Sequence, residues 1–402
     1  MAINLELPRK MQAAIDKAHQ GAAEMMRPIA RKYDLNEHAY PVELDTLSSL
    51  FSGAAESNAL GMAGTEAFRA GEDNKENRNG ANMAAVLQAL EASWGDAAML
   101  LSLPYEGLGN AALSGVATDE QLTRLGRVWA AMAITEPSFG SDSAAVTTTA
   151  TLDGDEYVIN GEKIYVTAGS RATHIVVWAT LDKSQGRPAI KSFIVPREHP
   201  GVTVERLENK LGIKGSDTAA IRFDNARIPK ENLLGTPEIE SGKGFSGVME
   251  TFDNTRPVIA AMAVGIARAT LEELRRILTD AGVEISYDKP SHAQSAAAAE
   301  FLRMEADWEA SYQLTLRAAW QADNKIPNSK EASMAKAKAG RVGSDITLKA
   351  VEMVGTTGYS EQTLLEKWAR DSKIMDIFEG TQQIQQLVVA RRLLGLSSSE
   401  LK

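Results

Sequence analysis

The feature that most constrains this chain is a change of hydrophobic period along its length. Before residue 132 and after residue 247, apolar side chains recur at helical spacing, whereas the stretch between holds short runs of alternating β-branched, aromatic and polar residues. Several short strands within about 90 residues are typical of a small β-barrel or sandwich. The sequence therefore predicts an α+β protein with an N-terminal helical domain over 1–131, a β-barrel domain over 132–246 and a C-terminal helical bundle over 247–402.

Individual elements follow from caps, turns and breakers. Thr381 is an expected helix N-cap, Pro257 fits a first helical turn, and Asn160-Gly161 favours a two-residue hairpin turn. The segment 52–82 is rich in Gly, Asn and charge and predicts a loop. The remaining predicted helices are 7–31, 42–51, 82–101, 119–132 and 330–354, and the remaining strands are 174–180, 190–195, 202–207 and 218–223.

Composition and charge argue against several classes of function. The net charge of −10 gives no general attraction to nucleic acid or anionic lipid, and the absence of cysteine excludes disulfides and thiolate chemistry. The five histidines are scattered without ligand spacing, which argues against a metal site. The longest apolar stretch, 258–267, is about half of a membrane span, and the start has no signal-peptide core. We expect a cytoplasmic protein.

Two segments near the helix-to-strand transition offer candidate binding groups. In 133–142, Thr135 and Ser141 are natural donors to ligand oxygens, although a plain capped turn explains the same residues. In 163–168, Tyr165 and Thr167 share one strand face, where an aromatic ring and a hydroxyl could stack on a flat cofactor. Ordinary strand alternation accounts for that pattern equally well.

A third segment offers a candidate base. Glu379 follows the apolar Ile377 and Phe378 and precedes Gly380, which permits close approach of a ligand. Desolvation beside apolar groups raises the proton affinity of a carboxylate, which suits a general base. The alternative is a solvated glutamate that interacts with the dipole of the last helix.

Taken in order, these motifs resemble the acyl-CoA dehydrogenase family over about residues 85–395. The matching stretches are Ile134-Thr-Glu-Pro with Gly140-Ser-Asp142, Asn160-Gly with Lys163 and Thr167, Leu211-Gly-Ile-Lys-Gly-Ser-Asp-Thr218, Ile228-Pro-Lys-Glu-Asn-Leu-Leu-Gly235, Gly242-Lys-Gly-Phe245, Phe252-Asp-Asn-Thr-Arg256 and Arg370-Asp371 with Ile377-Phe-Glu-Gly-Thr381.

The resemblance implies a fold and an activity. It implies a C-terminal four-helix bundle beside the β-barrel, with FAD between them. It implies α,β-dehydrogenation of an acyl-CoA thioester in fatty acid β-oxidation, with Glu379 as base and hydride transfer to FAD N5. An electron-transfer flavoprotein would then accept the electrons. The implied flavin contacts are Ile134, Thr135, Ser141, Tyr165, Thr167, Thr381 and Gln383, and the implied substrate contacts are Ser141, Asp253, Arg256 and Gly380.

The chain departs from the family pattern at the residues that relatives lend to a neighbouring subunit. Arg-x-x-Phe-Gly is absent from 277–290, Glu352 stands where a glutamine is usual, and a Gly-Gly pair reads Gly355-Thr356. A diphosphate normally needs a cationic partner. We therefore expect a second, different subunit that supplies it, as in heteromeric actinobacterial relatives of α2β2 type. The rival is a homo-oligomer that uses Lys289 or Arg276 instead.

Other functions stay open at this stage. The chain could be an accessory subunit without chemistry, although an inert chain has no need of a base at Glu379. An acyl-CoA oxidase is also compatible, because oxygen reactivity depends on access to the flavin. The sequence does not indicate whether the acyl group is straight, branched or a sterol side chain.

Overall fold

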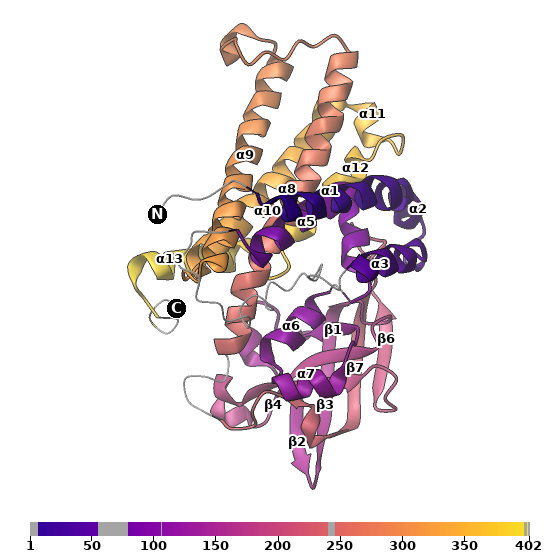
Figure 1. Ribbon diagram of the computed structural model, residues 1–402, viewed down its shortest axis with the longest axis vertical. Coiled ribbons are helices and arrows are strands. Elements are labelled where there is room, and N and C mark those ends of the chain that lie inside the picture. Colours follow the sequence, from indigo (N-terminus) through magenta and orange to yellow (C-terminus); the bar gives the residue numbers. More distant parts are fainter. Residues whose placement is uncertain (1–6, 55–78, 106, 240–245, 398–399, 401–402) are drawn as a thin grey trace.

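A computed structural model describes residues 7–54, 79–105, 107–239, 246–397 and 400. The predicted loop at 52–82 and the Gly242–Phe245 motif lie largely outside these residues. Figure 1 shows the strands gathered at one end of the molecule and the long helices α8, α9 and α10 extending toward the other, with the N-terminal helices across the middle. No described helix combines the length and the apolar character needed to cross a membrane.

The chain before the sheet is helical. α1 and α2 are joined by a π-helical turn, η1, and they pack on α5. α7 is capped by Thr118, which forms a reciprocal capping box with Gln121. These helices are α1 Arg9–Gly21, η1 Ala22–Met26, α2 Arg27–Leu35, α3 Glu43–Ala54, α5 Ala81–Ser102, α6 Leu108–Val116 and α7 Asp119–Leu125.

Eight strands form one sheet in the order β6-β7-β3-β2-β4-β5-β8, with β1 beside β4. β1 and β2 pair with β4 in parallel, and the other pairs are antiparallel. β6 and β8 end this order, so closure into the predicted barrel is not shown among the described strands. The strands are β1 Ala130–Ala133, β2 Thr149–Asp153, β3 Glu156–Thr167, β4 His174–Thr180, β5 Ile190–Pro196, β6 Val202–Leu207, β7 Thr218–Pro229 and β8 Leu233–Leu234.

The C-terminal helices enclose the largest core. α8, α9 and α10 pack against one another, α13 packs on α10, and α5 packs on α8. The side chains from Thr255 to Ala267 in α8 are all buried. The apolar stretch 258–267, which is too short to span a membrane, is therefore part of the protein core. The α+β prediction is confirmed. These helices are α8 Ser246–Asp280, α9 Ala296–Asp323, α10 Ser329–Val354, α11 Thr356–Tyr359, α12 Leu365–Ser372, η8 Lys373–Asp376 and α13 Gln382–Leu394, with short 3₁₀ turns at Ser143–Ala145, Lys183–Gln185, Arg187–Ala189, Lys230–Asn232 and Ser291–Ala293.

Three local predictions were wrong. Asn160-Gly161 lies inside β3 at a register shift against β7, and the β2–β3 turn falls instead at Gly154, whose φ is 64°. A Cβ at Gly161 would come within 2.4 Å of Thr148 Oγ1, so this glycine permits close packing rather than a turn. Pro257 lies inside α8, not in its first turn. The helix predicted over 119–132 ends at Leu125, because β1 already begins at Ala130.

Candidate active site

Glu379 lies in a turn between two helical segments. It follows the 3₁₀ turn η8, and α13 begins three residues later with Thr381 as its N-cap, as predicted. Glu379 has φ of 55° and Gly380 has φ of 88°, so two consecutive residues are left-handed. A left-handed non-glycine residue costs about 1–3 kcal/mol, and such strain is found where the surrounding structure fixes it. The turn therefore needs restraints.

Three side chains act on the Glu379 carboxyl. Thr255 Oγ1 donates a hydrogen bond to Glu379 Oε2 at 3.2 Å. Burial raises the pKa of Glu379 above its ordinary value, while the Thr255 hydrogen bond and the positive charges of Arg256 and Lys336 partly oppose that rise. This direction is the one that desolvation was expected to produce. The carboxyl is deep in the protein, yet part of the residue stays accessible.

The source of this desolvation differs from the sequence interpretation. Phe378 packs against the main core, but Ile377 is 46% exposed. On α8, the buried Thr255 bonds to the carboxylate and the buried Arg256 acts on it electrostatically.

Donors from two helices bind the backbone of the turn. Gln385 Nε2, on α13, donates to the Glu379 carbonyl at 3.0 Å and to the Gly380 carbonyl at 3.1 Å. Lys336 Nζ, on α10, donates to the Gly380 carbonyl at 2.7 Å. Lys336 is 1% exposed and Gln385 is 0% exposed. Burial lowers the pKa of Lys336 to about 8, although Asp376 and Glu379 act in the opposite direction.

A second group of predicted residues lies in the sheet. The Ile164 amide donates to the Thr135 carbonyl at 2.9 Å, which holds the 134–135 segment beside β3. Tyr165 has φ of 57° and lies where the β3–β7 pairing shifts register between Lys163 and Val166. Such a bulge re-aims a side chain, and the Tyr165 ring is 62% exposed. The Tyr165 and Thr135 positions are thus brought together at an accessible surface.

A buried ion pair between Lys163 and Glu136 holds the segment that contains Thr135 in place. Lys163 Nζ donates to Glu136 Oε1 at 2.9 Å and to the Ile134 carbonyl at 3.1 Å. Backbone amides of Thr147 and Thr148 donate to the same carboxylate at 2.7 and 2.9 Å. Burial alone would raise the pKa of Glu136, but Lys163 and the threonines outweigh it and hold the pKa at about 2. Glu136 is therefore a fully bonded anchor for the 134–139 turn.

The other predicted residues occupy varied positions. Arg256 is buried in α8 near Glu379, whereas Ser141 and Gln383 are exposed and Thr167 is half-buried. Asp253 is in α8, but its side chain lies outside the described residues.

The Leu211–Thr218 motif, which leads into β7, contacts α12, the helix that precedes the Glu379 turn. The Ile213 amide donates to Asp371 Oδ1 at 2.5 Å, and a Cβ at Gly212 would lie 2.4 Å from the Arg370 backbone. Lys367 Nζ binds Asp371 Oδ2 and Asp96 Oδ2, each at 2.5 Å, with all three side chains at most 1% exposed. The motif thus meets α12 where a buried ion cluster ties α12 to α5.

Sequence reasoning missed Thr255, Lys336 and Gln385. A signal existed for Lys336, because it follows Ala332 by four residues and precedes Ala339 by three, inside the apolar stripe of α10. A cation on such a stripe indicates a buried partner. Gln385 carried no comparable signal, since exposed glutamines surround it in sequence.

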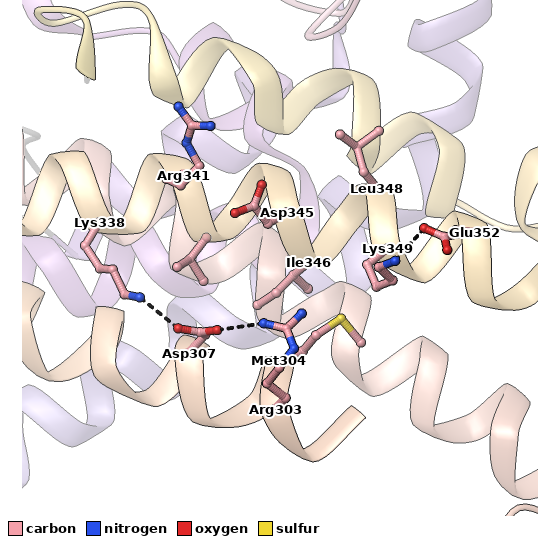
Figure 2. Close-up of a pocket in the computed structure, with 11 residues that line it drawn as sticks. Arg303, Met304, Asp307, Lys338, Arg341, Asp345, Ile346, Leu348, Lys349 and Glu352 are labelled. Atoms are coloured by element: carbon pink, nitrogen blue, oxygen red, sulfur yellow. Dashed lines mark hydrogen bonds and ion pairs between the residues drawn. The ribbon is translucent and has the colours of Figure 1, made fainter. Parts of the chain in front are cut away.

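A charged cleft of about 450 Å³ between α9 and α10 is a separate feature. In Figure 2 three of its cations are paired with carboxylates: Arg303 and Lys338 both bind Asp307, and Lys349 binds Glu352. None of the residues that line it belongs to the Glu379 turn. The Glu352 carboxylate, which the sequence analysis singled out, is thus paired with Lys349 Nζ at 2.6 Å.

Helical segments that precede and follow a mixed sheet in the sequence, with a desolvated glutamate in a left-handed turn near the C-terminus, define a class of fold shared with known enzymes. Residues 131–226 match the family profile of the acyl-CoA dehydrogenase middle domain, and residues 242–394 match that of the C-terminal domain. The chain belongs to the acyl-CoA dehydrogenase family.

Individual relatives agree. The chain is 38% identical over 294 residues to the probable acyl-CoA dehydrogenase YngJ of Bacillus subtilis, covering 71% of this chain and 76% of that protein. It is 39% identical over 269 residues to the mitochondrial short-chain specific acyl-CoA dehydrogenase of Rattus norvegicus, covering 65% of this chain but 62% of that protein. Butyryl-CoA dehydrogenase from Megasphaera elsdenii matches in structure, with a TM-score of 0.82, 28% identity and coverage of 98% and 100%.

Proposed function

We propose that this chain catalyses FAD-dependent α,β-dehydrogenation of an acyl-CoA thioester, with Glu379 as the base that removes the α proton. The observation that carries the proposal is the Glu379 carboxyl itself, which is desolvated, bonded to Thr255 and held in a left-handed turn. Family membership and relatives that are named acyl-CoA dehydrogenases support it.

The residues around Glu379 fit the task of a base. A raised pKa strengthens the carboxylate as a proton acceptor, while Thr255, Arg256 and Lys336 act against the rise and favour the ionised form. The missing Cβ at Gly380 makes room for the Gln385 amide, whose Nε2 would lie 2.4 Å from that atom, rather than for the ligand that the sequence suggested. The backbone N–H of Glu379 would polarise the thioester carbonyl and so stabilise enolate-like charge. Arg256 and Asp253 would line the substrate entrance.

The residues of the sheet fit a flavin. An accessible aromatic ring at Tyr165, next to the backbone of Thr135, is suited to a flat heteroaromatic ring system, and the Glu136–Lys163 pair preorganises that surface. FAD, when bound, supplies the hydride acceptor N5. Ile134, Thr135, Ser141, Tyr165 and Thr167 would hold the ring system, and Thr381 and Gln383 would contact it farther along the cofactor.

The partner proposal concerns the flavin diphosphate. The two substitute cations are both neutralised within the chain: Lys289 binds Glu284 at 2.8 Å, and Arg276 binds Glu273 at 2.8 Å and Asp280 at 2.9 Å. These pairs are largely exposed, so breaking them costs at most about 1 kcal/mol and is only a small obstacle to binding a diphosphate. The proposal of a heteromer, in which a second acyl-CoA dehydrogenase-like subunit supplies the cation, rests mainly on the missing Arg-x-x-Phe-Gly stretch. A cytoplasmic location and an electron-transfer flavoprotein as acceptor belong to the same proposal.

Expression of the chain alone and with candidate partner subunits tests both parts. We expect substoichiometric flavin alone and one flavin per pair of subunits in the complex, and turnover of one acyl-CoA class with an artificial electron acceptor. Full flavin occupancy of the chain alone would contradict the heteromer. Hydrogen peroxide production without the acceptor would identify an oxidase, and a flavin-loaded complex inert toward every acyl-CoA would leave an accessory role.

A further inference from the structure

The backbone of the Glu379 turn presents two carbonyls to donors from two different helices. Gln385 Nε2 lies 3.0 Å from the Glu379 oxygen and 3.1 Å from the Gly380 oxygen, and Lys336 Nζ lies 2.7 Å from the Gly380 oxygen. A Cβ at Gly380 would approach Gln385 Nε2 to 2.4 Å, so the amide is packed directly against the turn. These contacts involve backbone atoms, which no side-chain rotation of Glu379 can release.

The orientation of the Gln385 amide is dictated by its acceptors. Two carbonyl oxygens require the NH₂ group to face them, because a flipped amide would place oxygen against oxygen. The other end of the amide, Oε1, is buried without a hydrogen-bond partner in the described part of the chain. A side chain that leaves its own acceptor unsatisfied so that its donor reaches the turn indicates that the turn depends on the donor.

We propose that Lys336 and Gln385 are positioning residues for Glu379: they clamp the Glu379 and Gly380 carbonyls and thereby hold the carboxylate beside Thr255. The inference rests on the proposed role of Glu379 as the base. Without the clamp, the left-handed Glu379 and Gly380 can relax toward right-handed or extended backbone. The carboxylate would then leave its place against α8.

Lys336 has a second effect, because it carries charge. Its ammonium lies where it acts electrostatically on Glu379, whereas Gln385 is neutral. Loss of Lys336 should therefore disfavour ionised Glu379 and move the acidic limb of kcat/KM to higher pH. Loss of Gln385 removes no charge, so it should lower kcat and move that limb less than loss of Lys336 does. The other charged groups that face Lys336 or its neighbour Asp376 are Asp376 itself, Arg256, Arg341 and Lys373.

The variants are Lys336→Met, Lys336→Arg and Gln385→Leu in the flavin-loaded protein, with its partner subunit if one is required. Lys338→Met is the control on α10, because Lys338 binds Asp307 rather than the turn, and Gln386→Leu is the exposed control on α13. A misplaced catalytic group costs on the order of 100-fold in rate. We expect kcat to fall about 10- to 100-fold in all three variants and to stay within about twofold in the controls.

Two readouts separate positioning from general damage. Hydrogen–deuterium exchange of a peptide over 377–386 should accelerate in Lys336→Met and Gln385→Leu but not in the controls. The acidic limb should rise in Lys336→Met and move less in Lys336→Arg, which retains the charge, and in Gln385→Leu, which removes none. Unchanged exchange and an unmoved limb in Lys336→Met would overturn the proposal. If Lys336→Met does not fold, Lys336→Arg and Gln385→Leu decide it: unchanged exchange and kcat in both would refute the clamp.

A Glu379→Gln variant distinguishes failure of the clamp proposal from failure of the proposed function. If this variant loses turnover while the clamp variants behave like their controls, the clamp is wrong and the proposed function stands. If Glu379→Gln retains turnover, the proposed function itself fails.

Discussion

Replacing Lys367 with methionine should strongly destabilise the protein. Lys367 Nζ lies 2.5 Å from carboxylate oxygens of Asp96 and Asp371, and none of the three side chains is more than 1% exposed. Methionine has similar volume but no charge, so the variant would leave two unpaired carboxylates in the interior. Removal of one partner of a buried ion pair costs about 3–5 kcal/mol. We expect a loss of at least that size, since two carboxylates are abandoned.

Urea unfolding followed by tryptophan fluorescence measures this loss, with the buried Trp368 adjacent to the substitution. The control is Lys289→Met, which breaks an exposed pair with Glu284 and should cost at most about 1 kcal/mol. Adding Asp96→Asn and Asp371→Asn to Lys367→Met removes the abandoned charges and should recover part of the loss. If Lys367→Met is no worse than its control, the reasoning about the buried cluster is wrong.

Three further outcomes follow from the packing and charges. Gly212→Ala should lower the unfolding midpoint, because its Cβ would lie 2.4 Å from the Arg370 backbone, whereas Gly107→Ala, 3.8 Å from the Ala130 oxygen, should be tolerated; equal midpoints would contradict this. Glu136→Gln should destabilise by about 3–5 kcal/mol in thermal or urea unfolding, because it leaves Lys163 unpaired; a loss below about 1 kcal/mol would argue against the anchor. The kcat/KM of the enzyme should decline at low pH with an apparent pKa above 4.5, since the base must be ionised and burial raises its pKa; a limb below 4.5 would point to another base.

The sequence was most informative where local chemistry decides structure. Thr381 caps α13 as predicted, because an N-cap depends on residues within one turn. Asn160-Gly161 misled for the opposite reason. Its turn propensity is overridden by pairing with β7, and the glycine is required by the nearby Thr148, a contact that no local pattern reveals.

The site residues likewise fall into those that the sequence identified and those that depend on contacts distant in sequence. Glu379 and Tyr165 were identified through motif resemblance, and the raised pKa of Glu379 followed from expected burial. The helix that buries Glu379 could not be predicted, because Thr255 precedes it by 124 residues. Gln385 could not be assigned either, since its role depends on the backbone conformation of a neighbouring turn.

The most direct test of the central claim is the turnover of a Glu379→Gln variant. Glutamine keeps the shape of the side chain and its contact with Thr255 but cannot accept the α proton. We predict that the variant binds flavin and acyl-CoA as the unchanged protein does, as measured by absorbance, while its dehydrogenation rate with an artificial acceptor falls about 100- to 10,000-fold. A rate within a few fold of the unchanged protein would contradict the account.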